Sequence, residues 1–183
     1  MSPDIPSPRT ASEPRAFTAG EFLHGTVASW LSFNLLFAIA VIVGEASTHD
    51  PALGPLAGML AVLLVYLVPV SLVVSGIVAL LCCGAAWALG RALRRVGPPL
   101  PHLIGYAVLG AAIGAVVVAL YQLVVAHALD FSGGLTMLVL ACSAAALPLG
   151  WGWSVRRARR ADAGLIRSSR VDPDATAEDF IRP

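Results

Sequence analysis

The chain has 183 residues, of which 57% are hydrophobic and 13% are charged, and its formal net charge is +1. A soluble domain has roughly 25% charged residues and about 45–50% apolar ones, so the composition excludes an ordinary water-soluble globule. A mean hydropathy of +0.80 also excludes a disordered chain, because disorder requires low hydrophobicity and high net charge. We therefore expect a membrane protein, with lipids as its surroundings and no nucleic acid as a partner.

A helix start signal precedes the first apolar stretch. Thr18 and Glu21 have the spacing of a capping box, and Phe17 and Phe22 have the spacing of a hydrophobic staple. A cleaved signal peptide is the competing interpretation, since Gly44–Ala46 resembles a cleavage site. The apolar run is longer than the usual stretch of about 7–15 residues in such a leader, which favours a retained helix.

Four segments are long and apolar enough to cross a hydrocarbon core of about 30 Å, which takes roughly 20 residues. Backbone groups in lipid must be paired within their own segment, so each segment is expected to be an α-helix. The predicted fold is an all-α integral membrane bundle of four transmembrane helices, running up-down-up-down within residues 18–155. The helices are expected at about residues 18–45, 56–94, 102–129 and 135–157.

The second of these stretches is the longest. Pro55–Gly90 is uncharged and would form about 54 Å of helix at 1.5 Å per residue. Two spans and a turn need more than that, so we expect one long helix. Pro69 lies within it and Pro148 lies within the fourth helix, where each ring removes a backbone hydrogen bond and crowds the preceding turn. Both prolines predict kinks, either fixed by packing or acting as hinges during transport.

The arginines predict the orientation of the bundle, because positive charge near span ends stays on the cytoplasmic side. All 12 basic residues are arginines. They fall before the first helix, between the second and third, and from the end of the fourth onwards. We therefore expect both termini in the cytoplasm, as a disordered tail over residues 1–17 and a second tail over residues 158–183. The 4 tryptophans would lie near the same boundary, where tryptophan is enriched.

Polar residues within the spans are the candidates for a ligand site or a solute path. Glu45 is expected at the outer end of the first helix, either as a hydrated carboxylate or as a ligand for a proton or cation. Asn34 is the polar residue nearest the middle of that helix. Tyr66, Tyr121 and Gln122 are expected in the outer parts of the second and third helices. These side chains either form interhelical hydrogen bonds or line a solute cavity.

A stripe of small residues on the third helix predicts close contact with another helix. Small residues at four-residue spacing let two backbones approach, as in a GxxxG motif. The members are Ala107, Gly110, Ala111, Gly114 and Ala115. The pattern leaves open whether the partner helix belongs to the same bundle or to a second copy. Ala141 and Ala145 offer a further small face on the fourth helix.

No cofactor or metal is expected. Cys82, Cys83 and Cys142 contain no C-x-x-C motif, and we interpret them as small apolar residues. The 4 histidines fall at predicted helix ends, in two pairs with the same offset of 78 residues, which a duplicated hairpin would produce. A pair at one depth could hold a haem, but water or headgroups suffice at a helix end. The sequence also lacks phosphate-binding and hydrolase motifs, so we expect no enzyme activity.

These features favour a small non-catalytic accessory or scaffold subunit, acting through helix packing and its cytoplasmic tails. Its partner would be a second copy or another membrane protein. Arginine used without lysine fits a GC-rich genome and suggests a bacterial cell membrane. The alternative is an oligomeric small-solute transporter or channel, with Asn34 and the region of Tyr121 and Gln122 along the path. A haem-binding membrane redox protein is a distant third.

Overall fold

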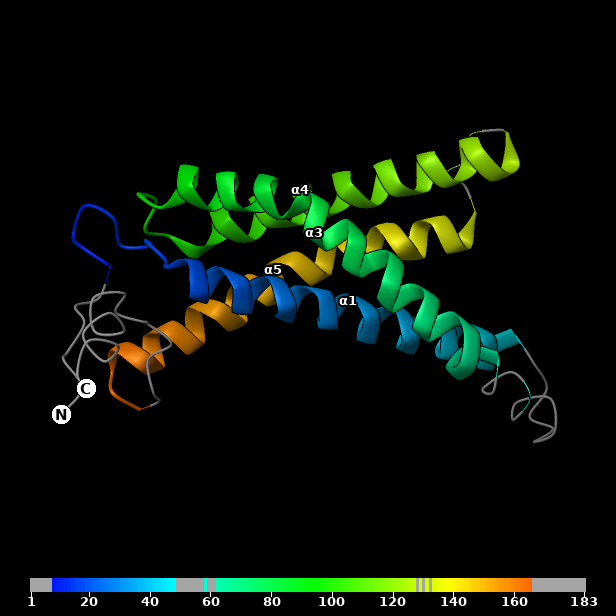
Figure 1. Ribbon diagram of the computed structural model, residues 1–183, viewed down its shortest axis with the longest axis horizontal. Helices are drawn as coiled ribbons and strands as arrows, with labels where there is room; N and C mark the ends of the chain where they lie inside the picture. The colour runs from blue at the N-terminus through cyan, green and yellow to red at the C-terminus, as the bar shows by residue number, and fades with distance from the viewer. Residues whose placement is uncertain are drawn as a thin grey trace, which may run out of the picture.

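The computed structural model describes residues 8–48, 58, 62–127, 129, 131 and 133–165. Within this part of the chain all regular elements are helical, and four helices are long and apolar enough to cross a membrane. They are α1 (Ala19–Thr48), α3 (Val68–Leu93), α4 (Pro99–Tyr121) and α5 (Gly134–Asp162) (Figure 1). Two π-helical turns, η1 (Leu63–Leu67) and η2 (Gln122–Ala126), precede α3 and follow α4. The expected all-helical architecture with four apolar helices is confirmed.

The start of α1 has the predicted cap. The backbone N–H of Glu21 donates to Oγ1 of Thr18 at 3.2 Å, and the N–H of Thr18 donates to Oε2 of Glu21 at 3.1 Å. The rings of Phe17 and Phe22 stack with their centroids 5.9 Å apart. Capping box and staple are both confirmed, and together they fix the direction in which the chain enters α1.

Several helix ends differ from the sequence-based bounds: α1 runs to Thr48 rather than to about residue 45, and α4 with η2 ends at Ala126 rather than near residue 129. α4 begins at Pro99 rather than near residue 102, with Pro98 in an extended conformation as its N-cap. Proline is tolerated in a first turn because the N–H that it lacks would have no acceptor there. α5 continues to Asp162 rather than ending near residue 157. Arginine has a high helix propensity, so the basic run extends the last helix instead of ending it.

The two prolines lie where the backbone departs from a straight helix. Pro69 is in the first turn of α3, directly after the π-helical turn that contains Val65. Pro148 is inside α5, which changes direction near its middle (Figure 1). A π-helical turn and an internal proline are both recognised causes of helix bending.

α5 is the central helix of the bundle. It packs most extensively on α1 and α4, whereas α3 has fewer contacts, which it makes with α1 and α4. The buried residues of α4 and of α5 recur at multiples of four positions, so each of these helices buries one stripe of its surface. On α5 they are Cys142, Ala146, Gly150 and Ala158, and on α4 they are His102, Tyr106, Gly110, Gly114 and Val118.

Close backbone approach holds α5 between its neighbours. A Cβ at Gly110 would overlap the backbone carbonyl of Ser143, and a Cβ at Gly114 would lie 3.0 Å from the Ser143 side chain. The two glycines of the predicted stripe therefore face α5. The alanines of that stripe, Ala107, Ala111 and Ala115, lie beside this contact and are partly exposed.

The contact between α1 and α5 uses a reciprocal pair of small motifs that the sequence analysis did not identify. Gly25 packs against Ser154, since a Cβ there would lie 3.1 Å from the Ser154 Cβ. A Cβ at Gly150 would overlap the side chain and backbone nitrogen of Ser29. Gly25 and Ser29 in α1 are small residues four positions apart, and so are Gly150 and Ser154 in α5. This spacing is the sequence signal that could have revealed the contact. The small residues of α5 that contact α1 thus include Gly150. Ala141, which belongs to the small face expected from the sequence, is exposed.

A substitution at the α1–α5 contact tests its role in stability. Gly150→Val is expected to lower the free energy of unfolding by about 1–3 kcal/mol, because the new side chain cannot fit beside Ser29. Gly152→Val is the matched control, since a Cβ at Gly152 of the same helix meets nothing within 4 Å. Denaturant unfolding of the purified protein in detergent measures both. Equal losses in the two variants would contradict this packing.

Candidate binding cavity

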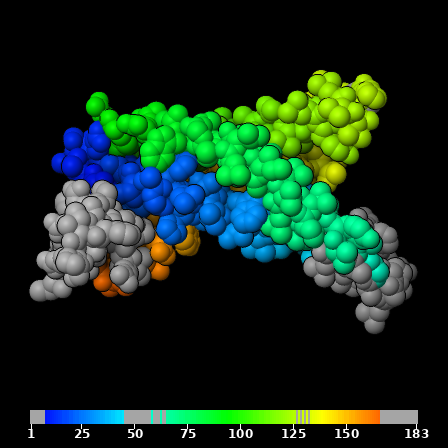
Figure 2. All heavy atoms as spheres, in the orientation of Figure 1, coloured from blue at the N-terminus to red at the C-terminus, as the bar shows by residue number. Residues whose placement is uncertain are grey.

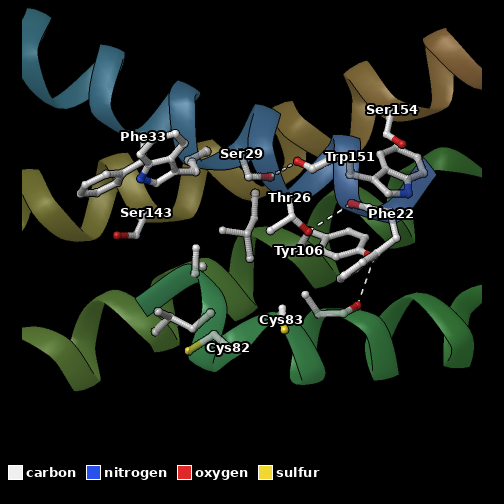
Figure 3. Close-up of a pocket in the computed structure, with 18 of the residues that line it drawn as sticks. Phe22, Thr26, Ser29, Phe33, Cys82, Cys83, Tyr106, Ser143, Trp151 and Ser154 are labelled. Carbon is white, nitrogen blue, oxygen red and sulfur yellow. Dashed lines mark hydrogen bonds between the residues drawn. The ribbon is translucent and has the colours of Figure 1, made fainter. Parts of the chain in front are cut away.

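A cavity of about 380 Å³ lies between α1, α3, α4 and α5. It exists because α5 holds α1 and α4 tightly, while α3 covers the remaining side of the bundle with few contacts. Figure 3 shows Phe22, Thr26, Ser29 and Phe33 of α1 on one side and Cys82 and Cys83 of α3 on the other. Its deepest lining residues, farthest from the arginines, include Phe37, Leu67, Val117 and Val139.

The hydroxyl groups that line this cavity are mostly used by the protein itself. Oγ1 of Thr26 donates to the carbonyl oxygen of Phe22 at 3.1 Å, and Oγ of Ser29 donates to that of Gly25 at 3.0 Å. Oγ of Ser154 donates to the carbonyl oxygen of Glu21 at 2.7 Å. Such back-bonding satisfies the hydroxyl without a ligand. Ser143 is the exception, because the described residues offer its hydroxyl no hydrogen bond. The cavity surface therefore consists mainly of methyl groups and aromatic rings.

Asn34 takes part in a hydrogen-bond network between α1 and α3. Its Nδ2 donates to Oγ of Ser75 at 3.0 Å and to the carbonyl oxygen of Trp30 at 2.9 Å. Its Oδ1 accepts from Oγ of Ser71 at 2.8 Å. Nε1 of Trp30 also donates to Oγ of Ser75, at 3.0 Å. Asn34 does not line the cavity, and its amide acts as an interhelical link rather than as a free ligand.

The other polar candidates do not gather around Asn34. Tyr66 in η1 is 67% exposed and Tyr121 at the end of α4 is 62% exposed. Gln122 donates through Nε2 to Oγ1 of Thr136 at 3.3 Å, which links η2 to the start of α5. The side chain of Glu45 lies outside the described residues. Among the described side chains, no one site unites Asn34 with Tyr66, Tyr121 and Gln122.

Residues 8–18 cross one end of the bundle, which composition alone did not indicate. The guanidinium of Arg15 donates to the carbonyl oxygen of Gly97 through Nε at 3.1 Å and through Nη2 at 2.9 Å. The Arg15 backbone N–H donates to the carbonyl oxygen of Arg94 at 3.1 Å. The Arg15 side chain also lies over Trp151, 5.8 Å from its ring centroid. This segment thus ties α1 to the α3–α4 connection and to α5.

A second set of contacts at the same end involves charged pairs. Nη2 of Arg9 lies 2.9 Å from Oε2 of Glu21, and Nη1 lies 2.7 Å from Oδ2 of Asp162. Glu13 accepts from Arg94, with 3.1 Å between Nε and Oε1. The carboxylate of Glu21 is largely buried, so its pairing with Arg9 is protected from screening. The start of α1 and the end of α5 are therefore joined through one arginine.

Histidines and cysteines form no metal site in the described part of the chain, where no group of three or more suitable ligands occurs. His102 is buried at 2% exposure, with Nδ1 donating to the carbonyl oxygen of Pro98 at 3.1 Å and its ring stacked on Trp151. His24 donates through Nδ1 to the carbonyl oxygen of Gly20 at 2.7 Å. His49 lies outside the described residues.

Comparison of the chain with protein-family models, with curated proteins and with solved structures gave no match. The cavity and the arginine contacts at its end are therefore the basis for any proposal about function.

A double-mutant cycle tests the link between Asn34 and Ser71. Asn34→Ala and Ser71→Ala are each expected to destabilise the bundle, with a coupling free energy of about 0.6 kcal/mol and at most about 1.7 kcal/mol. Unfolding in detergent micelles measures the cycle. Thr26→Val combined with Asn34→Ala is the control, because Thr26 bonds within its own turn and the two effects should add. Full additivity of the Asn34 and Ser71 effects would contradict the link.

Proposed function

We propose that the chain is a small, non-catalytic, multi-pass accessory protein of a cell membrane, which binds an apolar group in its central cavity. Its helices run up-down-up-down, and both termini are cytoplasmic. Its outer helix faces provide the contacts with lipid and with a partner, either a second copy or another membrane protein.

The distribution of arginines supports this orientation. Within the described residues, arginines occur at the start of α1, around the α3–α4 connection and in the last turns of α5. The contacts of Arg9 and Arg15 bring these three places together at one end of the bundle. A bundle end that gathers the positive charge belongs on the cytoplasmic side.

The character of the cavity surface carries the proposal for binding. A path for polar solutes needs polar groups that are free to replace the solute's hydration, because unpaired polar groups are costly in an apolar medium. Here the hydroxyls of Thr26, Ser29 and Ser154 are engaged by backbone carbonyls. Asn34 is engaged between α1 and α3. An apolar occupant fits this surface better than a hydrated solute.

Two features support a binding role rather than catalysis. Among the described residues, the cavity is lined by the thiols of Cys82 and Cys83 but by no histidine that could act as a base for them. Its one lining carboxylate, Glu21, is paired with Arg9 and caps α1. General acid–base and nucleophilic catalysis both need a base within hydrogen-bond reach of the group that it activates.

The helix with the loosest packing supports an accessory role. None of the most apolar window of Val65–Leu93 is buried inside the bundle. Its outer face, including Leu80 at 74% exposure and Leu81 at 79% exposure, is left for lipid or for a helix of another chain.

Fusion reporters test the orientation. Green fluorescent protein fused after Pro183 is expected to fluoresce, because it folds on the cytoplasmic side of a bacterial inner membrane. Alkaline phosphatase fused after Thr48, at the end of α1, is expected to be active, because it requires the outer side. The reverse pattern of the two signals would overturn the proposed orientation.

Photo-crosslinking tests the cavity. In phosphatidylcholine nanodiscs, a monoacylglycerol with a diazirine near its chain end is expected to label cavity residues such as Phe37 and Val117, as mapped by mass spectrometry. Ala79→Phe, which fills the cavity, should remove most of this labelling, whereas Leu80→Phe on the exposed side should not. Labelling unchanged by Ala79→Phe would refute the site. Glycerol uptake into liposomes that Ala79→Phe abolishes would favour the transporter instead.

A further inference from the structure

The cavity is not chemically uniform along its length. Its end near the α3–α4 connection is lined by Arg9, Arg15 and Arg159, and the rest of its lining is mainly aliphatic and aromatic. In a bundle oriented as proposed above, these arginines lie at the cytoplasmic boundary. The cavity thus combines a cationic end with an apolar interior.

The three arginines are not equally neutralised. Arg9 is paired with Glu21 and Asp162. Arg15 donates to the carbonyl oxygen of Gly97, and among the described residues no carboxylate pairs with Arg15 or Arg159. Burial lowers the pKa of Arg15, and the nearby charges of Arg159 and Arg9 lower it further, which shows that like charges crowd together here. Arg15 and Arg159 thus leave positive charge available at this end of the cavity, because arginine remains protonated.

We propose that the cavity binds a single-chain anionic lipid, with its chain between the helices and its phosphate group at Arg15 and Arg159. This inference rests on the proposed binding function and names its ligand class. A guanidinium can donate two parallel hydrogen bonds to phosphate oxygens, which makes arginine well suited to this headgroup.

The dimensions of the cavity fit such a ligand. Lining residues on α1 extend from Glu21 to Phe37, which corresponds to about 24 Å at 1.5 Å per residue. A lipid chain with its headgroup at one boundary needs to reach about half of the roughly 30 Å hydrocarbon core. One extended chain therefore fits along the cavity.

The bundle also offers an entry route from the membrane. α3 and α4 lie together near the arginines and separate towards their other ends (Figures 1 and 2). Figure 2 shows the resulting notch in the surface. A chain can enter sideways through this opening, while residues 8–18 cover the end of the bundle.

Competition against the photoactivatable monoacylglycerol tests the selectivity. The two competitors are lysophosphatidylglycerol, which is anionic, and lysophosphatidylcholine with the same chain, which has no net charge. Both are added to the full-length protein in phosphatidylcholine nanodiscs. Lysophosphatidylglycerol is expected to compete at least tenfold more strongly. A fatty acid of equal chain length shows whether a carboxylate replaces the phosphate.

Charge-removing variants locate the headgroup. Loss of one arginine near an anionic group weakens binding by about fivefold, so Arg15→Gln with Arg159→Gln should weaken lysophosphatidylglycerol binding by about 25-fold. Arg160→Gln, adjacent in α5 and outside the cavity lining, is the matched control and should change binding less than twofold. Arg15→Lys keeps the charge and should retain most of the affinity. Unchanged cavity labelling of the double variant by the monoacylglycerol, which has no phosphate, shows that its cavity is intact.

The outcomes separate the two proposals. Equal competition by both lysolipids, with cavity labelling present, would overturn the anionic selectivity and leave the binding function standing. Equal losses in Arg160→Gln and in the double variant would place the lipid on the general basic surface and overturn the headgroup site. Absence of cavity labelling by the monoacylglycerol would overturn the binding function itself.

Discussion

The close approach of α5 to both α1 and α4 is the constraint on which the rest of the structure depends. Gly150 lies against Ser29, and Gly110 lies against the carbonyl of Ser143, so the backbones meet where no side chain intervenes. In lipid, helices associate through such van der Waals packing, because apolar side chains gain nothing by leaving an equally apolar solvent. A change in either glycine would therefore move a whole helix rather than one side chain.

This arrangement also explains why a cavity remains. α1 and α4 are both fixed on α5, so α3 covers the space between them, and its small residues at four-residue spacing, Ser71, Ser75 and Ala79, line the cavity. Its links to α1 include the hydrogen bonds of Ser71 and Ser75 to the amide of Asn34 and the edge-to-face contact of Trp87 with Phe22. The central space thus lies beside the helix that packs most loosely on its neighbours.

Much of the fold could be predicted from the sequence, because the signals were local. Apolar length gave the four helices, and the spacing of Thr18 and Glu21 gave the start of α1. The partner of the Gly110 and Gly114 stripe could not be predicted, since small residues signal close approach without naming the opposing helix. The pairing of Gly25 and Ser29 with Gly150 and Ser154 was visible as spacing, but it became specific only in three dimensions.

The candidate site was harder to predict, because the sequence analysis searched for polar residues at mid-depth. Asn34 proved to be engaged with α3, and the exposed Tyr66 and Tyr121 lie apart from it. The cavity is formed instead by residues whose sequence signal is ordinary for a core, such as Phe33 and Ala79. Arg15 looked like part of a polar tail, and its contacts with Gly97 and Trp151 depend on a fold that composition does not encode.

The sorting of charge along the bundle has a consequence beyond orientation. The arginines gather at one end of the bundle, while the hydroxyls of Thr26 and Ser29 in its interior are engaged by backbone carbonyls. A ligand with a charged headgroup at one end and an apolar chain along the rest of its length loses little hydration of that headgroup when its chain enters the cavity. It also leaves no buried charge unpaired, which is the costly outcome in a medium of low dielectric constant. This character of the cavity supports the proposal that it binds an amphiphile aligned with the bundle.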